Sequence, residues 1–310
     1  MPDLVSYCKR ERAYRLQNGC PIQYAALRRA IHPLLLLAMQ VYHAVQNIKI
    51  ITIGHVPKIK QPIIFAVSHI GMYDVEVVLQ AIRRHTYLLS GDEEAMYRTF
   101  DGGFFAANGV IWVDPEDRDD RMVAYETTVK YLRNGLNIFW CPEGTWNLTE
   151  SRIILPLHNR IIEAAVAAGA VIIPIGVDQR DKEKGIDFMV NIGDPFLPEE
   201  HFTGELTQAI KNELADELRG RMARLKYDIW ESADRADFDD GYYARFLEKR
   251  IQEWPFYNLD IIRTRMFNPN KTVPEKEVFA HLDTIEVGPR NAFLARVKIE
   301  FQHDHIKDIW

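Results

Sequence analysis

Short apolar runs alternate with helical segments through the middle of the chain, and this alternation constrains the fold more than any other feature. Five runs read as buried strands, at residues 63–67, 86–89, 110–113, 137–141 and 171–175. Between them, apolar residues at helical spacing occupy 122–132 and 161–166, and Gly169 is expected to end the second of these helices. Strands separated by helices predict the α/β class, with a mostly parallel central sheet flanked by helices.

Further signals predict where the other elements begin and end. Asp119 or Asp120 is the expected N-cap of the helix over 122–132, and Gly135 is its expected stop. Residues 188–192 predict one more strand before a Pro-Phe-Leu-Pro turn. Beyond that turn, apolar residues recur every three or four positions between 206 and 229. This spacing predicts a long amphipathic helix that packs one stripe on the domain.

These patterns divide the chain into three parts. Residues 1–49 are expected to form a basic, amphipathic helical arm, residues 50–200 the α/β core, and residues 201–310 a helical extension packed on that core. The segment 231–310 is polar and rich in aromatic side chains, without a linker, a low-complexity tract or an internal repeat.

Charge is distributed unevenly along the chain. The whole sequence has a net charge of −6, yet residues 1–60 hold nine basic and two acidic side chains and are therefore net positive by seven. A basic end on an acidic body is the arrangement expected of a protein that meets an anionic surface with one end. The acidic body disfavours nucleic acid as a partner.

An apolar stretch within the arm favours contact with a membrane. Residues 31–48 read IHPLLLLAMQVYHAVQNI. One helical face carries Leu34, Leu37, Ala38, Val41, Val45 and Ile48. The stretch is shorter and more polar than the roughly 20 apolar residues of a spanning helix. Two interpretations remain: a helix packed on the domain, or one in the lipid headgroup layer. Arg28 and Arg29, placed near lipid phosphates, favour the second.

Location and cofactors are predicted from what the sequence lacks. A signal peptide has an apolar core near the start of the chain, but here charged residues occupy that region. The sequence has three cysteines, an odd number that cannot form a fully paired disulfide framework. We therefore expect a peripheral protein on the cytoplasmic side of a membrane. The sequence has no metal-binding pattern of cysteines or histidines and no phosphate-binding glycine loop. We expect neither a metal nor a bound cofactor.

The sharpest local signal is Ser-His-Ile-Gly-Met-Tyr-Asp at 68–74, directly after the first predicted strand of the core. Ligand crevices form at the carboxyl ends of strands in open α/β sheets. His69 is expected on the turn and Asp74 in the first turn of the following helix, where its carboxylate can accept a hydrogen bond from the imidazole. Such a bond fixes the tautomer and raises the basicity of the other ring nitrogen. The alternative is a capping aspartate beside a surface histidine.

Three more segments accompany this one, and each lies either at the end of a predicted strand or inside one. They are Gly-Val-Ile-Trp-Val-Asp at 109–114, Cys-Pro-Glu-Gly-Thr at 141–145 and Val-Ile-Ile-Pro-Ile-Gly at 171–176. Together the four segments, in this order and at this approximate spacing, resemble the glycerolipid acyltransferase family, typified by 1-acylglycerol-3-phosphate O-acyltransferase. The resemblance covers about residues 50–192.

The resemblance implies a role for each matching residue. His69 would be the general base and Asp74 its orienting partner, while Pro174 would line the acyl pocket. Three residues of the Pro-Glu-Gly-Thr turn would position the acyl acceptor: Glu143, Gly144 and Thr145. The resemblance also implies a membrane-associated enzyme of phospholipid biosynthesis or remodelling, which takes its acyl group from a thioester of coenzyme A or acyl carrier protein.

Two positions depart from the family's pattern, which usually has arginines there to hold the phosphate of the acceptor. Trp146 follows the Gly-Thr pair, and Arg118 is displaced and surrounded by carboxylates; both are retained as candidate acceptor-binding residues. Other candidates for the phosphate are Arg121, Arg152, His158 and Arg160.

The identity of the acceptor is therefore open. A lysophospholipid hydroxyl, with lysophosphatidic acid as the simplest case, is the first hypothesis. The second keeps the chemistry but replaces the acceptor with a lysolipid of another headgroup or with an amine. The third is a catalytically silent membrane-surface protein of the same fold. The intact pair of His69 and Asp74 speaks against the third hypothesis.

The expected reaction is direct attack of an acceptor hydroxyl on the thioester carbonyl. His69 would remove the hydroxyl proton, and backbone N–H groups near the Ile70–Gly71 turn, at a helix start, are candidates for stabilising the developing oxyanion. Ser68 and Cys141 are not expected to act as nucleophiles. Neighbours along a backbone rarely point at each other, and a thiol at the end of an apolar strand is commonly buried and inert.

Overall fold

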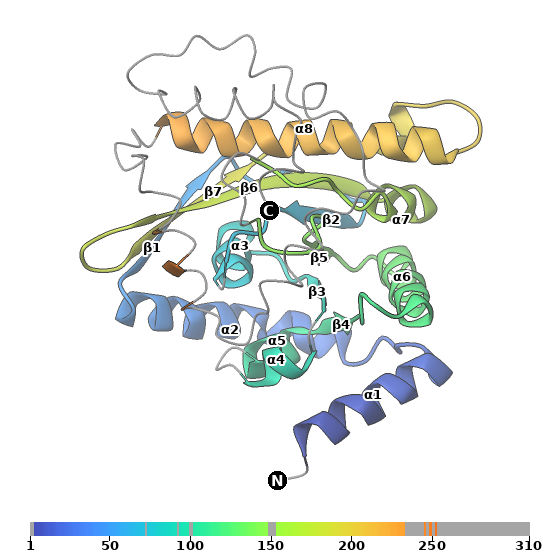
Figure 1. Cartoon of the computed structure of the whole chain (residues 1–310), viewed down its shortest axis with the longest axis horizontal. Coiled ribbons are helices and arrows are strands. Elements are labelled where there is room, and N and C mark those ends of the chain that lie inside the picture. The colour runs from blue at the N-terminus through green and yellow to red at the C-terminus, as the bar shows by residue number, and fades with distance from the viewer. Residues whose placement is uncertain are drawn as a thin grey trace.

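The computed structural model describes residues 3–71, 73–91, 93–98, 102–147 and 153–232, together with residues 245, 248, 249 and 252. Within these residues a seven-stranded sheet has the order β1-β7-β6-β2-β5-β3-β4. The strands are β1 (Ile48–Ile53), β2 (Ile63–Val67), β3 (Tyr87–Ser90), β4 (Val110–Trp112), β5 (Ile138–Trp140), β6 (Val171–Asp181) and β7 (Ile186–Ile192). Neighbouring strands are parallel except β6 and β7, which form an antiparallel hairpin. The predicted α/β class with a mostly parallel sheet is confirmed (Figure 1).

The strands expected from apolar runs are present, and two differences stand out. Strand β6 has eleven residues rather than five, because its second half pairs with β7 in the hairpin. Strand β1 was not predicted: its first residue, Ile48, was assigned to the apolar helix of the arm. Four isoleucines and a threonine in this six-residue segment favour the extended backbone that pairs with β7.

The helices occur in the order α1 (Leu4–Asn18), α2 (Ala25–Val45), α3 (Asp74–Ile82), α4 (Glu93–Arg98), α5 (Gly102–Asn108), α6 (Arg118–Arg133), α7 (Arg160–Ala168) and α8 (Gln208–Ser232), with a short 3-10 turn at Pro198–Glu200. The prediction for the N-cap of α6 is wrong. Asp117 is the cap, because one of its carboxylate oxygens accepts the N–H groups of Asp119 and Asp120 at 2.8 and 2.9 Å. Gly169 ends α7 as predicted.

Helices cover both faces of the sheet. One face, with Ile64 and Ile172, packs into a core shared with α6, α7 and α8. The opposite face, with Ile63 and Ile173, packs into a core shared with α3. In Figure 1, α8 lies along one side of the sheet, and α3 and α2 lie on the other. Because both faces are covered, the central strand β2 is apolar at every position.

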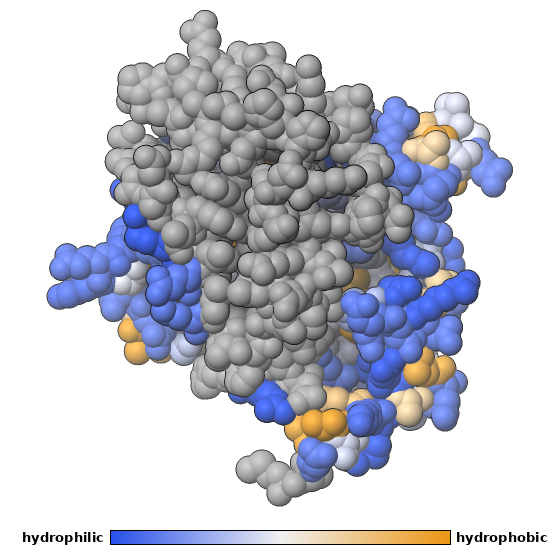
Figure 2. Space-filling model, viewed as in Figure 1, coloured by the Kyte–Doolittle hydropathy of each residue, from blue (hydrophilic) through white to orange (hydrophobic). Residues whose placement is uncertain are grey.

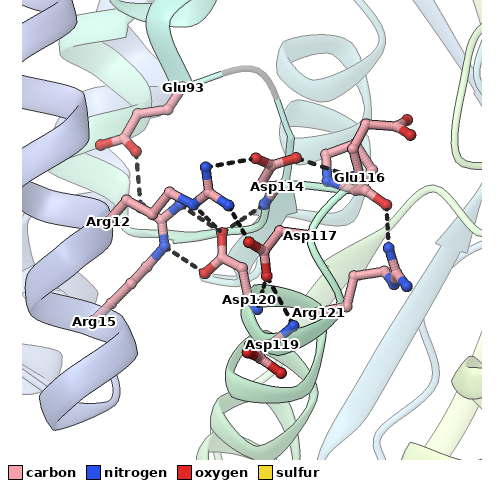
Figure 3. A network of polar contacts seen from close by, with 10 residues as sticks. Arg12, Arg15, Glu93, Asp114, Glu116, Asp117, Asp119, Asp120 and Arg121 are labelled. Atoms are coloured by element: carbon pink, nitrogen blue, oxygen red, sulfur yellow. Dashed lines mark hydrogen bonds and ion pairs between the residues drawn. The ribbon is translucent and has the colours of Figure 1, made fainter.

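Helix α1 is fastened to the body by two arginines (Figure 3). Arg15, only 7% exposed, donates to both carboxylate oxygens of Asp120 at 2.8 and 2.7 Å and to Glu93 of α4 at 2.8 Å. Arg12 pairs with Asp117, the N-cap of α6. Paired contacts between a guanidinium and a carboxylate fix both distance and orientation. Part of the arm's positive charge is therefore bound by the acidic body.

Helix α2 buries two histidines and a methionine, and it exposes a row of large apolar side chains. His32, Met39 and His43 are buried, with His32 hydrogen-bonded to Asn108 at 3.0 Å and His43 to Gln80 at 2.7 Å. Burial lowers the pKa of His43 to about 4. More than half of each large apolar side chain on the outer side is exposed: Leu27, Leu34, Leu37, Val41 and Val45. Figure 2 shows hydrophobic residues at the surface on the side where α1 and α2 lie.

The two arginines near the start of α2 bind backbone carbonyls of the body. Arg28 donates to the carbonyls of Ala106 and Ala107 at 2.7 and 2.9 Å, and Arg29 donates to that of Gly135 at 2.9 Å. The carbonyls of Ala106 and Ala107 lie in the last turn of α5, where helix carbonyls lack intrahelical partners, and that of Gly135 lies just after the end of α6. Both side chains therefore fasten α2 to the body, and their contact with lipid phosphates stays a prediction.

Candidate active site

The candidate site lies at the carboxyl end of β2, in the middle of the sheet. The strand continues into Ser68, whose N–H donates to the carbonyl of Ile175 at 3.1 Å and whose hydroxyl accepts the N–H of Val177 at 2.8 Å. Ser68 is fully buried by these contacts with β6. This serine therefore joins two strands, and it fixes the backbone from which His69 projects.

His69 and Asp74 form the predicted pair. Nδ1 of His69 lies 2.8 Å from Oδ2 of Asp74, which is the first residue of α3 and is completely buried. A carboxylate is an acceptor only, so the proton of the imidazole sits on Nδ1 and the lone pair on Nε2. The His69 side chain is 22% exposed. The arrangement presents a basic ring nitrogen that can be reached from outside, backed by a buried negative charge.

The predicted oxyanion donors are engaged elsewhere. The N–H groups of Ile70 and Gly71 donate to Oδ2 of Asp74 at 2.6 and 3.0 Å. The same oxygen that holds the imidazole is thus held by the two residues that follow it. The prediction of an oxyanion site near this turn therefore fails for these two N–H groups, because the turn uses them to fix Asp74.

Glu143 lies next to this pair, after β5, and its carboxylate joins two backbone segments. One oxygen accepts the N–H of His69 at 2.9 Å, and the other accepts the N–H of Leu155 at 2.8 Å. The residue is 4% exposed, and burial raises the pKa of its carboxyl group, while the positive charge of Lys226 opposes that rise. The structure therefore places Glu143 beneath His69, as a support for its backbone.

The residues after Glu143 surround the imidazole. Gly144 has φ +76°, and a Cβ there would come within 2.6 Å of the ring of His158, so only glycine fits this turn. Thr145 is 1% exposed, and its hydroxyl has no hydrogen-bond partner among the described residues. The Trp146 ring packs edge-on against His69 with the ring centroids 5.9 Å apart. The Pro-Glu-Gly-Thr turn and the His–Asp pair thus share one site.

Two other predicted site residues are not brought into contact with His69. Arg118 is exposed in the first turn of α6, after β4, which is three strands away from β2 in the sheet. Pro174 lies inside β6 opposite Ala66 of β2, and its ring packs toward Gly193 and Leu225 on the face covered by α8. The assignments of Arg118 to the acceptor and Pro174 to an acyl pocket remain predictions.

Cys141 and the remaining candidates for the phosphate have other surroundings. Cys141 carries a free thiol, and burial raises its pKa well above the usual value, which disfavours the nucleophilic thiolate. Arg121 donates to the carbonyl of Pro115 at 2.6 Å, and the guanidinium of Arg160 stacks over Tyr125. Arg152 lies outside the described residues. The described residues contain no cluster of side chains that could hold a metal ion.

Comparisons with known proteins bear on the family and the fold. A model of the acyltransferase family matches residues 45–178, which include both His69 and Glu143. Among solved structures, the chain is similar to the 1-acyl-sn-glycerophosphate (LPA) acyltransferase PlsC from Thermotoga maritima, with 14% identity and a TM-score of 0.50, over 73% of this chain and 89% of that one. Residues 45–178 therefore form a domain of the acyltransferase family. The chain is an acyltransferase. A search of curated proteins found no match.

The acyltransferase site also contains residues that the sequence did not point to. The N–H of Asn147 donates to the carbonyl of His69 at 2.8 Å, so both backbone polar groups of His69 are held by the segment after β5. Leu155 and Lys226 act on Glu143 from further along the chain. These residues belong to no recognisable motif, because their contacts form only when distant segments fold together.

Proposed function

We propose that this acyltransferase moves a fatty acyl group from a thioester of coenzyme A or acyl carrier protein to the hydroxyl of a lysophospholipid. The observation that carries the proposal is the buried Asp74 carboxylate on Nδ1 of His69, which leaves Nε2 as a base at an exposed strand tip. The substrate class is drawn from the similar fold of PlsC, which acts on lysophosphatidic acid. A role in phospholipid synthesis or remodelling follows from that substrate class.

The proposed reaction needs one base and no covalent enzyme intermediate. Nε2 of His69 takes the proton of the acceptor hydroxyl while the hydroxyl oxygen forms its bond to the thioester carbonyl carbon. The tetrahedral intermediate then expels the thiolate, which takes the proton back from the imidazolium. Asp74 stays ionised and stabilises the imidazolium between these two steps. General base catalysis of this kind contributes about 10²–10⁴ in rate.

A lipid panel tests the proposal. The purified full chain is incubated with radiolabelled acyl-CoA or acyl carrier protein and, in parallel, with lysophosphatidic acid, lysophosphatidylcholine, lysophosphatidylethanolamine and a long-chain amine. We expect label in the product of at least one lysophospholipid, with the highest kcat/KM for lysophosphatidic acid. Release of free fatty acid without labelled lipid from any lysophospholipid would overturn the proposal.

A second candidate keeps the chemistry and changes the acceptor. The position after the Gly-Thr pair holds Trp146, whose ring packs against His69, and Arg118 lies three strands away. Neither residue brings a cation next to the imidazole. An acceptor without a phosphate monoester, such as a lysolipid with another headgroup or an amine, would need no cation there. Labelling of those acceptors but not of lysophosphatidic acid identifies this second candidate.

The outer face of α2 supports a peripheral position on an anionic membrane. Large exposed apolar patches are rare on soluble monomers and mark interaction surfaces. Here five exposed leucine and valine side chains share one side of a 21-residue helix whose histidines face inward. Among the described residues, no helix is long and apolar enough to cross a membrane. The stripe can instead enter the headgroup layer, and the thioester donors and the free cysteines fit the cytoplasmic side.

Placing charge on this stripe is expected to release the protein from lipid. The double variant Leu37→Glu/Val41→Glu should bind phosphatidylglycerol-containing vesicles about tenfold or more weakly, because two exposed apolar side chains are replaced by carboxylates. Sedimentation with vesicles measures the change. The matched control, Gln208→Glu/Asn212→Glu, adds the same charge at exposed positions of α8. Equal binding by both variants would remove α2 from the membrane contact.

A further inference from the structure

We propose that helix α8, which lies outside the matched family segment, positions the catalytic base of this acyltransferase through Arg219, Lys226 and the Glu143 carboxylate. The inference rests on the proposed role of His69 as that base. It assigns to the helical extension a part in the reaction, in addition to its packing on the sheet. Arg219 and Lys226 are positioning residues, because they act through other groups.

Glu143 is the link between the catalytic turn and the rest of the body. Its two oxygens accept the N–H groups of His69 and Leu155, which are 86 positions apart in the sequence. A charged carboxylate suits this task, since it accepts at both oxygens and donates at neither. A neutral amide could satisfy only one of the two N–H groups. The position of His69 therefore depends on where Leu155 lies and on whether Glu143 is ionised.

Arg219 fixes the position of Leu155. Its side chain is completely buried, and it donates from Nε and Nη2 to the carbonyl of Ile154 at 2.9 and 2.7 Å. Ile154 and Leu155 share a peptide bond, so the guanidinium holds the carbonyl while Glu143 holds the N–H of the same peptide unit. A displacement of Arg219 must move that peptide and, through Glu143, the backbone of His69.

Lys226 acts on the ionisation of Glu143. It lies two helical turns after Arg219 on α8 and is 5% exposed. Its positive charge is the strongest influence that lowers the pKa of Glu143, against the larger effect of burial, which raises it. Charges in a buried environment are screened less than charges at the surface. Lys226 thereby favours the ionised form of Glu143, which both N–H groups require.

The packing of α8 against β6 holds the helix rigidly relative to the turn that carries His69. A Cβ at Gly176 would come within 2.9 Å of the backbone nitrogen of Lys226, so the glycine lets the helix backbone touch the strand. The same strand holds the turn of the base through Ile175 and Val177, which bind Ser68. Helix α8 and the catalytic turn are thus both fixed to β6, and Glu143 closes the connection.

The test removes the charge of Lys226 without removing its volume. In Lys226→Met we expect kcat to fall about tenfold with both KM values unchanged, because a small misplacement of a catalytic group lowers the rate of the chemical step. In the pH profile of kcat, the fall on the acid side (the acid limb) should also move to higher pH. Without the cation the pKa of Glu143 rises further, so Glu143 becomes protonated, and loses one acceptor site, at a higher pH than in the wild type.

Three further variants complete the experiment. Lys226→Arg keeps the charge and should restore the wild-type acid limb. Arg224→Met removes one positive charge from the exposed side of the same helix and should leave kcat and the pH profile unchanged. Glu143→Gln should lower kcat at every pH and make it insensitive to Lys226→Met. Circular dichroism confirms that each variant is folded.

The outcomes separate this inference from the proposed function. A wild-type acid limb and wild-type kcat in Lys226→Met would overturn the role of α8, while the lipid panel still establishes the activity. An equal fall in Arg224→Met would also overturn it, since the effect would then be one of net charge. If Lys226→Met does not fold, Arg219→Lys provides the second measurement. It keeps the charge but loses the two-point contact with Ile154, so kcat should fall with the acid limb unmoved.

Discussion

Replacing His69 with alanine is expected to lower kcat for acyl transfer by about 10²–10⁴, the range that general base catalysis contributes. Nε2 of this ring is the proposed proton acceptor, and its other nitrogen is held by Asp74 at 2.8 Å. Initial rates with radiolabelled acyl donor measure the change. The control is His55→Ala, which removes an exposed histidine outside the site and should retain wild-type activity. Wild-type rates in His69→Ala would remove His69 from the mechanism.

The same rate measurement with Asp74→Asn tests the carboxylate that orients the proposed base, His69. Oδ2 of Asp74 accepts three hydrogen bonds, from His69, Ile70 and Gly71. An asparagine oxygen can take over these bonds, but the negative charge that stabilises the imidazolium is lost. We therefore expect a large fall in kcat with little change in KM.

Replacing Arg15 with methionine is expected to lower the free energy of unfolding by about 3–5 kcal/mol, because breaking a buried ion pair leaves an uncompensated charge. Asp120 is completely buried, and Arg15 donates to both of its oxygens (Figure 3). Urea unfolding followed by tryptophan fluorescence measures the effect. Arg15 lies in α1, far along the chain from its partners in α4 and α6, so its loss should also release α1 from the body.

The matched control for this variant is Arg10→Met, on the exposed side of the same helix. It removes the same charge, and surface charges contribute little to stability, so its unfolding midpoint should stay within experimental error of the wild type. Equal midpoints for the two variants would show that the buried pair contributes nothing beyond a surface charge. The double variant Arg15→Met/Asp120→Asn should recover part of the loss, because it removes the unpaired carboxylate as well.

The order of strands and helices could be read from the sequence because of how the sheet is buried. Both faces of β2 are covered, so all five of its residues are apolar and completely buried, and the strand was predicted with its correct ends. Strand β1 is an edge strand in which only Ile48 is buried; the strand was not predicted, and Ile48 was assigned to the preceding helix. Periodicity reports burial, and burial is weakest at the edge of a sheet.

The pairing of His69 with Asp74 could be predicted for a related reason. His69 and Asp74 are five positions apart across a strand end and a helix start, so a local turn is enough to bring them together. The oxyanion prediction failed within the same turn. The pattern gave no sign that Oδ2 of Asp74 would take the N–H groups of both intervening residues. Motifs identify which side chains meet, but not how backbone groups are shared among them.

The arm shows the limits of charge and amphipathicity. Its sequence predicted a helix with an apolar face, which the structure contains, and basic residues for an anionic surface. Arg15 binds two carboxylates of the body, and Arg28 and Arg29 bind its backbone carbonyls, while the buried side of α2 is the one with the histidines. A helical pattern separates two faces without stating which of them faces the protein.

The sequence by itself determined the α/β class, the pairing of His69 with Asp74, and the strand tips at which the candidate site lies. These features depend on contacts between neighbours along the chain, or on burial repeated over a whole element, and residue patterns record both. Only the tertiary structure decided that Glu143 supports the backbone of His69, that α8 reaches this support, and that α2 exposes its leucines. Each of these depends on single contacts between segments tens of residues apart, which leave no periodic trace in the sequence.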